Sequence, residues 1–302
     1  MNNLSNLTVV IVTFLTDKKT LMNCLNSIDR RVKVILVENS HKFKDKNFFL
    51  NKYSNLKIFC SGKNLGYGGG NNYGLKKTNT QYALILNPDT ILDKYFFKNI
   101  KLILNNQSFS LIGCELLKNK GFATGGFFDS KKNDEFKKNF LITSRDNLTK
   151  VDWVTGSSML LNFKNLKNKK IFDENFFLYF EEFDFCKFLK EKKKEVYLSK
   201  NLKISHLGFK SSNLDIPDFR DEAEKLRNWH WMWSLFYFHK KNYNYFYAIY
   251  KTIDKFFKSF IKIFFYMLIF DKKNSFKYIF RLLGLSASMI GCKSYYRGKF
   301  FS

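Results

Sequence analysis

Short apolar runs rich in Val, Ile and Leu alternate with amphipathic segments over the first third of the chain. Runs of this length predict buried strands, and they lie at 7–14, 32–39, 56–61 and 82–87. Apolar side chains recur with helical spacing at 18–28, 68–79 and 93–105. Strands and helices that follow one another in this way predict an α/β fold with a mainly parallel sheet and helices on both faces.

Beyond residue 110 the pattern is less regular. Two strand-like pieces, 110–117 and 151–162, flank a loop at 118–149 that is rich in Gly, Lys and Asn. A helix is predicted from the acidic stretch to about residue 193, and the runs EVYLS and LKISH after it predict two short strands. From about residue 215 the chain has helical patterns to its end.

The composition shifts near 212–217, and we therefore predict a domain boundary there. The first domain would comprise residues 1–214, and residues 215–302 would form a helical, basic and aromatic extension. Hydrophobic residues make up 45% of the 302 residues, which is enough for a sizeable core and argues against disorder.

The chain carries 52 Lys and Arg against 26 Asp and Glu, a formal net charge of +26. Such a charge suits polyanionic partners, namely nucleic acid, anionic lipid or phosphorylated substrates. The abundance of Asn, Phe and Ile, with only 2 prolines, is also what an AT-biased genome produces. The charge alone therefore does not choose a function.

The five cysteines form no C-x-x-C pair, which predicts neither a zinc knuckle nor a disulfide framework and fits a reducing compartment. No basic region precedes the first apolar run, so we expect no signal peptide. No stretch reaches the roughly 18 uncharged apolar residues of a membrane span. Together these features predict a cytoplasmic protein.

In parallel α/β sheets ligands bind at the carboxyl ends of the strands, so candidate chemistry is sought there. GYGGGNNYGL follows the third strand and opens a helix, and glycines in such a place let backbone N–H groups approach a phosphate or sugar. Asn71 breaks the dinucleotide-binding pattern G-x-G-x-x-G, and no G-K-[ST] follows. A flexible helix entry is the alternative interpretation.

Two further polar residues lie at predicted strand ends. Asp89 in NPDT could ligate a divalent cation that is coordinated mostly by a ligand's phosphates. The alternative is an N-cap for the helix that begins near Asp93. His206 ends LKISH, where a lone histidine is more often structural than a metal ligand.

Seven motifs resemble, in order and spacing, those of family 2 glycosyltransferases, in particular the rhamnosyltransferase-like branch. The resemblance covers about residues 7–240 and implies a GT-A fold, a nucleotide-sugar donor, a divalent metal and inversion at the anomeric carbon. An Asp and a His do not separate Mg²⁺ from Mn²⁺. The motifs are VTF, VENS, NLGYGGGNNYGL, NPDT, WVTGSSMLL, FDENFFLYFEEFDFC and HLGFKS.

Carried over position by position, the resemblance implies a donor site, an acceptor side, a metal site and a base. Asp89 and His206 would bind the metal, and Glu182 falls at the position of the catalytic base. The implied donor-binding residues are Thr13, Glu38, Asn39, Asn64, Gly66, Gly68 and Asn87. The residues assigned to the acceptor side are Trp153, Gly156, Glu181 and Asp184.

Two positions depart from the family pattern. Glu38 and Glu182 each stand where the family usually has Asp, which keeps the charge and shifts its reach by about one bond.

Three acids lie among aromatics in FFLYFEEFDF, where a carboxylate is costly to bury unless it is paired, coordinated or reactive. An inverting transfer needs one base for the acceptor hydroxyl, and on a helix Glu181 and Glu182 point about 100° apart. We assign Glu182 as the base, while Glu181 and Asp184 would orient the acceptor or receive hydrogen bonds from neighbouring donors. A helix N-terminus stabilised by acids is the alternative, and both interpretations can hold.

The segment 249–270 predicts an amphipathic helix with lysines in one narrow stripe. It suits lying in a membrane interface with lysines toward lipid phosphates, or packing on the catalytic domain with its lysines solvated. RNWHWMWSLFYFHKKNY (227–243) would add an acceptor-side or membrane-proximal surface. The stripe is Lys251, Lys255, Lys258 and Lys262, and the opposite face is Ile249, Ile253, Phe256, Phe260, Phe264 and Met267.

The sequence thus predicts an inverting, metal-dependent transferase that moves a sugar, for example from dTDP-rhamnose, to a cell-surface polysaccharide or lipid-linked glycan. It would be cytoplasmic and peripheral on the inner face of the membrane, with no nucleic-acid partner. A sugar-nucleotide nucleotidyltransferase is disfavoured because no Gly-rich, Arg- or Lys-bearing loop follows the first strand. A nucleic-acid-binding protein is disfavoured because the lysines are dispersed. A non-catalytic family member is the remaining alternative.

Overall fold

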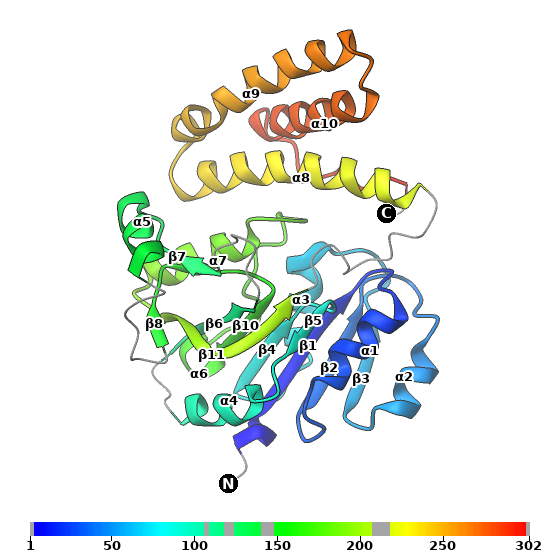
Figure 1. The fold of residues 1–302 in the computed structure, drawn as a ribbon, viewed down its shortest axis with the longest axis vertical. Helices are drawn as coiled ribbons and strands as arrows, with labels where there is room; N and C mark the ends of the chain where they lie inside the picture. The colour runs from blue at the N-terminus through cyan, green and yellow to red at the C-terminus, as the bar shows by residue number, and fades with distance from the viewer. Residues whose placement is uncertain (1–2, 106–108, 118–123, 140–147, 207–217, 300–302) are drawn as a thin grey trace. The chain divides into compact units, whose positions relative to one another are not determined.

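The computed structural model describes residues 3–105, 109–117, 124–139, 148–206 and 218–299 (Figure 1). The chain divides into two compact units, each described by itself below. The predicted boundary at 212–217 lies outside the described residues and stays a prediction. The sheet unit comprises Met1–Lys63, Gly70–Phe172 and Phe185–Asn213, and the helical unit comprises Asn64–Gly69, Asp173–Asp184 and Leu214–Ser302.

The sheet unit is built on one large sheet with strand order β3-β2-β1-β4-β10-β6-β11-β5, and β8 pairs with β11 (Figure 1). The first four strands of this order are parallel, whereas β10 runs antiparallel to both of its neighbours. The strands are β1 (Leu7–Thr13), β2 (Lys33–Glu38), β3 (Leu56–Cys60), β4 (Tyr82–Leu86), β5 (Thr90–Leu92), β6 (Leu111–Leu116), β8 (Leu148–Lys150), β10 (Ser158–Asn162) and β11 (Val196–His206). A separate pair joins β7 (Gly125–Gly126) to β9 (Trp153–Val154).

The four strands predicted in the first third of the chain are confirmed, and so is the α/β fold class. Two details differ from the predictions made from the sequence. EVYLS and LKISH form one strand, β11, whose pairing with β6 shifts register between Ser199 and Lys203. The parallel arrangement is confined to β3-β2-β1-β4 and the β6–β11 pair, because β10 inserts between β4 and β6 in the opposite direction.

Helices cover both faces of β1, as its alternating side chains require. On one face Leu7, Val9 and Ile11 join an apolar core with Phe49 and Phe96. On the other face Val10 and Val12 meet helix α3. The helices that begin or lie in this unit are α1 (Lys18–Asn26), α2 (Lys46–Lys52), α3 (Gly66–Lys76), α4 (Phe96–Leu104), α5 (Ser130–Asn139), α6 (Phe163–Leu166) and α7 (Glu181–Glu191), with α3 and α7 starting in the helical unit.

Two glycines four residues apart let α3 lie close against the sheet. A Cβ atom at Gly70 would lie 2.7 Å from Cγ1 of Val12, and one at Gly74 would lie 2.6 Å from Cγ1 of Val10. Both separations are shorter than carbon atoms tolerate. At Gly70 and Gly74, GYGGGNNYGL therefore serves close packing of α3 against the sheet. The flexible helix entry considered from the sequence stays a prediction for the start of the motif.

The helical unit contains three long helices, α8 (Phe219–Asn242), α9 (Tyr245–Leu268) and α10 (Lys272–Met289), which confirms the predicted helical C-terminal region (Figure 1). Asn244 caps α9 by accepting from the backbone N–H of Tyr247, and Asp271 caps α10 by accepting from that of Asn274. Among the described residues, none of the helices combines the length and apolar character needed to cross a membrane.

The stretch 227–243, which the sequence suggested as an acceptor-side or membrane-proximal surface, lies on α8 up to Asn242 and supplies much of the core of the helical unit. Trp229, Trp233 and Phe236 are buried there. Gly284 of α10 allows the close approach of α8, since a Cβ atom at this position would lie 2.1 Å from the carbonyl oxygen of Trp229.

We predict that Gly74→Val destabilises the protein by about 2 kcal/mol or more, because two methyl groups would enter a filled helix–sheet contact. Urea denaturation followed by circular dichroism measures the loss. Lys76→Val is the matched control, since it places the same side chain at an exposed position of α3. Equal midpoints for the two variants would contradict the close-packing role of Gly74.

Candidate active site

Three predicted donor-binding residues meet at the carboxyl ends of β1 and β2. Thr13 and Glu38 are paired in register, and the Thr13 hydroxyl donates to Oε2 of Glu38 at 2.7 Å. The Ser40 hydroxyl donates to Oε1 at 2.8 Å, so both carboxylate oxygens of the longer Glu side chain are engaged. Burial raises the pKa of Glu38, and the hydrogen bonds from Thr13 and Ser40 oppose that rise. The backbone N–H of Asn39 donates to the Thr13 carbonyl at 2.7 Å.

The two predicted metal ligands also meet at the sheet edge. His206 lies opposite Thr90 in the β5–β11 pair, which carries the end of β11 to the NPDT turn. Nε2 of His206 is 3.1 Å from Oδ1 of Asp89 and 3.5 Å from Nδ2 of Asn87. Asp89 is buried, while a quarter of the His206 side chain is exposed. Residues 207–211 of HLGFKS lie outside the described residues.

The alternative role for Asp89 as a helix cap is wrong. Helix α4 begins at Phe96, with Tyr95 at its N-cap position. Asp93, rather than Asp89, accepts a hydrogen bond from the backbone N–H of Tyr95. Asp89 is instead in the short turn between β4 and β5.

The Asp89–His206 pair fits part of a divalent cation site. It offers one carboxylate oxygen and one imidazole nitrogen close together, a donor set that Mn²⁺ and Mg²⁺ accept. Among the described residues no group of three or more His, Cys, Asp or Glu side chains is assembled to hold an ion. A cation here would therefore complete its coordination with ligand oxygens and water, as Mg²⁺ usually does.

The WVTGSSMLL motif runs beside this pair. The backbone N–H of Asn87 donates to the carbonyl of Ser157 at 3.0 Å, in the turn that also contains Gly156. The Trp153 indole N–H donates to the carbonyl of Phe127 at 3.2 Å, which fixes the half-buried ring. Their assignment to the acceptor side stays a prediction.

In the helical unit, the first turn of α3 is joined to the segment before α7. The side-chain oxygen of Asn64 accepts from the backbone N–H of Gly66 at 3.0 Å. Gly66 has φ +75°, and a Cβ atom there would lie 2.1 Å from the carbonyl oxygen of Phe177. That carbonyl accepts from the backbone N–H of Tyr67 at 3.0 Å. Gly66 is thus required by both its backbone angle and a close approach.

The chain enters α7 through a strained turn. Tyr179 and Phe180 have φ of 70° and 68°, which costs bulky residues roughly 1–3 kcal/mol each. Their rings pack against Trp231, with centroid distances of 5.2 and 5.3 Å. Strain of this kind gathers at functional sites, and it directly precedes Glu181.

Within the described part of the chain, the first two acids of α7 have no cationic partner. Glu181 is buried, and its Oε2 has no hydrogen-bond partner among the described residues. Burial and the charge of Glu182 raise the pKa of Glu181 well above its usual range. Burial raises the pKa of Glu182 to about 7. Tyr67 lies near both carboxylates, whose charges add to burial in raising its pKa.

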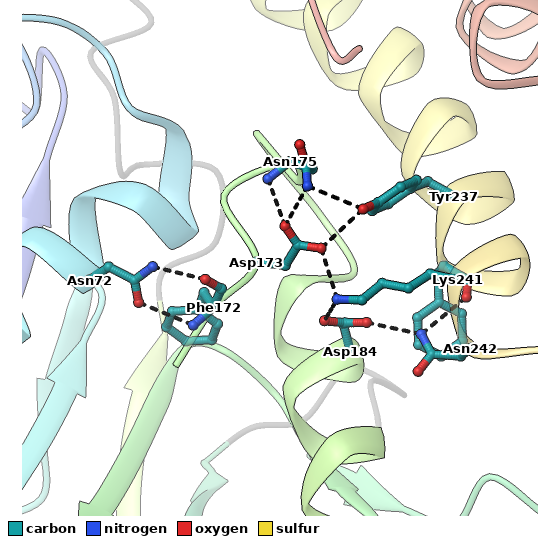
Figure 2. Close-up of polar contacts among 9 residues, drawn as sticks. Asn72, Phe172, Asp173, Asn175, Asp184, Tyr237, Lys241 and Asn242 are labelled. Carbon is teal, nitrogen blue, oxygen red and sulfur yellow. Dashed lines mark hydrogen bonds and ion pairs between the residues drawn. The ribbon is translucent and has the colours of Figure 1, made fainter. Parts of the chain in front are cut away.

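Asp184, in the same turn, belongs to an ion-pair network with α8 (Figure 2). The Lys241 ammonium is 2.7 Å from Oδ2 of Asp184 and 2.8 Å from Oδ2 of Asp173. The Asn242 amide donates to Oδ1 of Asp184 at 2.9 Å, and the Tyr237 hydroxyl donates to Asp173 at 3.1 Å. Asp184 therefore receives hydrogen bonds from neighbouring donors, one of its two expected roles.

The pKa values follow these contacts. Burial alone would raise the pKa of Asp173, but hydrogen bonds from Lys241 and Asn175 outweigh it and the pKa is lowered. For Asp184 burial prevails over Lys241 and Asn242, and its pKa is raised. The two carboxylates raise the pKa of Lys241 despite its partial burial.

The structure thus assembles the predicted residues in two groups. One group, in the sheet unit, contains Thr13, Glu38, Asn39, Asn87, Asp89, Trp153, Gly156 and His206. The other, in the helical unit, contains Asn64, Gly66, Gly68, Glu181, Glu182 and Asp184. Sequence reasoning missed Tyr67 and Lys241. Tyr67 directly follows a quoted glycine, so the motif could have indicated it, whereas nothing local pairs Lys241 with Asp184.

Comparison with known families identifies the chain. The model of glycosyl transferase family 2 matches residues 8–167, more than half of the sequence. The chain belongs to glycosyl transferase family 2. The low-salt glycan biosynthesis hexosyltransferase Agl10 of Haloferax volcanii is 26% identical over 191 residues, which is 61% of this chain. The chain likewise spans 61% of that relative's length, so less than two thirds of it.

Solved structures share the fold of this family 2 member. A crystal structure of GalNAc-T7 with UDP, GalNAc and Mn²⁺ matches with a TM-score of 0.52 and 13% identity, over 76% of this chain and 50% of that one. A crystal structure of S. aureus TarS 1–349 matches with a TM-score of 0.50 and 13% identity, over 98% of both chains. These similarities support the GT-A-like fold expected from the sequence.

We predict that Lys241→Met destabilises the helical unit by about 1–3 kcal/mol, because it leaves Asp184 buried without its cation. The figure is below that for a fully buried pair, since Lys241 is partly exposed. Tryptophan fluorescence during urea denaturation reports this unit, because α8 holds three of the four tryptophans.

Lys240→Met, at an exposed neighbouring position, should change stability by less than about 0.5 kcal/mol. Adding Asp184→Asn to Lys241→Met should recover part of the loss, since the buried charge is then removed. A double variant that is no more stable than Lys241→Met would argue against the ion pair as the cause.

Proposed function

We propose that this protein is an inverting, metal-dependent glycosyltransferase that transfers a sugar from a nucleotide-diphosphate donor to a glycan acceptor. The observation that carries the proposal is the separation of acids in α7. Asp184 is paired with Lys241, whereas Glu182, at the position that the resemblance gives to the base, has a pKa of about 7 and no cation beside it among the described residues. A general base is most effective when its pKa is close to the working pH.

In the proposed reaction the Glu182 carboxylate takes the proton of an acceptor hydroxyl as its oxygen attacks the anomeric carbon. The bond from that carbon to the diphosphate oxygen breaks, and a single displacement inverts its configuration. Thr13, Glu38 and Asn39 would hold the nucleoside. Asp89 and His206 would hold a divalent cation, which neutralises charge on the diphosphate when bound.

The donor and acceptor are the finer part of the proposal. We propose a sugar nucleotide such as dTDP-rhamnose as donor, and a lipid-linked glycan or growing cell-surface polysaccharide as acceptor. The glycan biosynthesis role in the name of the Haloferax volcanii relative supports the acceptor class. The proposed site of action is the cytoplasmic face of the membrane, where a lipid-linked acceptor is reached.

Family membership favours this reading over the nucleotidyltransferase and nucleic-acid-binding alternatives. A non-catalytic member of the family would have no need of two buried glutamates that contact no cation among the described residues, or of a preassembled Asp89–His206 pair. Both are present here.

We predict that Asp89→Ala and Glu182→Gln both abolish transfer. The first would remove a proposed metal ligand and the second the proposed base, and measurements of nucleotide binding distinguish the two effects. Melting temperature is measured with UDP, dTDP, GDP and CDP, each with and without Mn²⁺, because a ligand of the native state raises it. The protein should show a metal-dependent shift with one nucleotide. Glu182→Gln should keep that shift, and Asp89→Ala should lose it.

Asn105→Ala, an exposed change at the end of α4, is a control that should alter neither property. Full activity of both site variants would show that the sites are misassigned. A folded protein whose melting temperature changes with none of the four nucleotides would contradict the proposal that it is a glycosyltransferase.

We predict that transfer activity rises with pH through an apparent pKa near 7, because Glu182 must be ionised to accept a proton. Stability should change in the opposite direction. The folded state binds the Glu182 proton more tightly than the unfolded chain, so this contribution is fully present below about pH 4.5 and is lost as pH rises to about 7.

The pH dependence of kcat/KM and of the melting temperature measures the two effects. Burial lowers the pKa of His230 to about 3 and that of His239 to about 4, so neither produces the inflection near 7. Glu182→Gln should be more stable than the unsubstituted chain at pH 8 and should lose that advantage at pH 5. A stability difference that does not change between these pH values would contradict the assignment.

A further inference from the structure

Helix α9 packs within the helical unit through small side chains. Ala248, Thr252 and Ser259 are its buried residues, and Ala248 joins a core with Met232, Phe236 and Leu285. Ile249 and Phe256 also pack against that core. Two of the six residues expected on the apolar face of this helix therefore point inward, and the packing partners are α8 and α10.

The large apolar side chains of α9 lie on its other side. At about 100° per residue they are centred roughly opposite Ala248, Thr252 and Ser259. They recur at alternating intervals of four and three residues, so they form one continuous row along the helix. This row, the α9 stripe, comprises Phe246, Tyr250, Ile253, Phe257, Phe260, Phe264 and Met267, all of them exposed.

The stripe continues into the turn that leads to α10. Leu268, Ile269 and Phe270 are exposed there, and Phe270, at 89%, is the most exposed large apolar residue among the described ones. At the other end Phe246 is 83% exposed. Ile261 and Phe265 widen the row. Proteins rarely expose so long a contiguous apolar surface unless it contacts a partner or a membrane.

The region that comprises α9 and α10 is strongly positive. Residues 245–290 carry eight Lys and Arg side chains against only two acids, Asp254 and Asp271. Lys272 and Lys273 are exposed just beyond Phe270, at one end of the stripe, and Lys251 and Lys258 are exposed on the polar face of α9, roughly 130–150° around the helix from the centre of the stripe. An apolar face of aromatic and aliphatic side chains, with lysines on the polar face and at the end of the helix, is the composition of helices that lie in a membrane interface.

The charge also distinguishes two possible partners of the stripe, a second copy of this chain and an anionic lipid surface. A second copy docked through the same face would bring two sets of lysines together, which costs electrostatic energy. The phosphates of anionic lipids attract those lysines while the acyl boundary takes up the apolar side chains. We propose that the α9 stripe and the turn at 268–270 dock on the surface of an anionic phospholipid bilayer.

This docking is independent of the transfer chemistry, and it can be tested without any sugar donor. The full chain is mixed with phosphatidylcholine vesicles, or with vesicles that also contain about 30 mol% phosphatidylglycerol, and bound protein is measured by sedimentation. We expect binding to the anionic vesicles, much weaker binding to the neutral ones, and a decline as salt is added.

The test variant is Phe257→Ser/Phe260→Ser/Phe264→Ser, which should weaken binding to anionic vesicles more than about tenfold. The matched control, Tyr95→Ser/Leu102→Ser/Phe188→Ser, removes three exposed apolar side chains elsewhere and should bind as the unsubstituted chain does. Retention of the nucleotide-induced melting shift by the test variant shows that it is folded and that donor binding is unaffected.

Three results would overturn the proposal. One is a folded chain that does not bind anionic vesicles at low salt. Another is equal weakening by the control variant. The third is a chain that does not bind vesicles but forms a concentration-dependent dimer in sedimentation velocity, when the test variant abolishes the dimer and the control variant does not. The stripe would then contact a second copy.

Discussion

The desolvation of carboxylates at the start of α7 is the constraint on which the helical unit depends. Asp173 and Asp184 are stabilised there by one ammonium group, that of Lys241. Glu181 and Glu182 begin the same helix, no such cation contacts them within the described ranges, and burial holds both pKa values high. Acids a few residues apart are thereby given different protonation behaviour by their surroundings alone. One pair supports the fold through its contacts with Lys241, and the other is the pair that we propose exchanges a proton.

Contacts of the neighbouring backbone and side chains restrain the segment that carries these acids. The carbonyl of Phe177 holds the first turn of α3, and the strained backbone at Tyr179 and Phe180 is supported by the packing of their rings against Trp231. Lys241 anchors the next part of α7 to α8. A carboxylate held in this way needs little rearrangement to accept a proton, which is how preorganised sites gain rate.

The sequence predicted the parts of the molecule in which local pattern and tertiary structure agree. The strands β1 to β4 and the sheet edge with Thr13, Glu38, Asn87 and Asp89 follow from apolar runs that end in polar residues. The direction of β10 did not follow, because SMLLN is buried throughout and gives no sign of its orientation. Lys241 and Asp184 are 57 positions apart, so their pairing was invisible without the fold. On α9 the packed face is marked by small residues, and an argument from apolar side chains selected a face rotated from the true one.

Gly66, Gly70 and Gly74 of α3 are required by contacts with Phe177, Val12 and Val10 that involve no proposed reacting group. A descendant that lost the glutamates of α7, and with them the proposed activity, would still have to pack α3 against the same strands. It would keep the glycine-rich motif while having no catalytic role. The motif is thus a marker of ancestry, whereas the proposed catalytic acids of α7 would distinguish an active enzyme from an inactive relative.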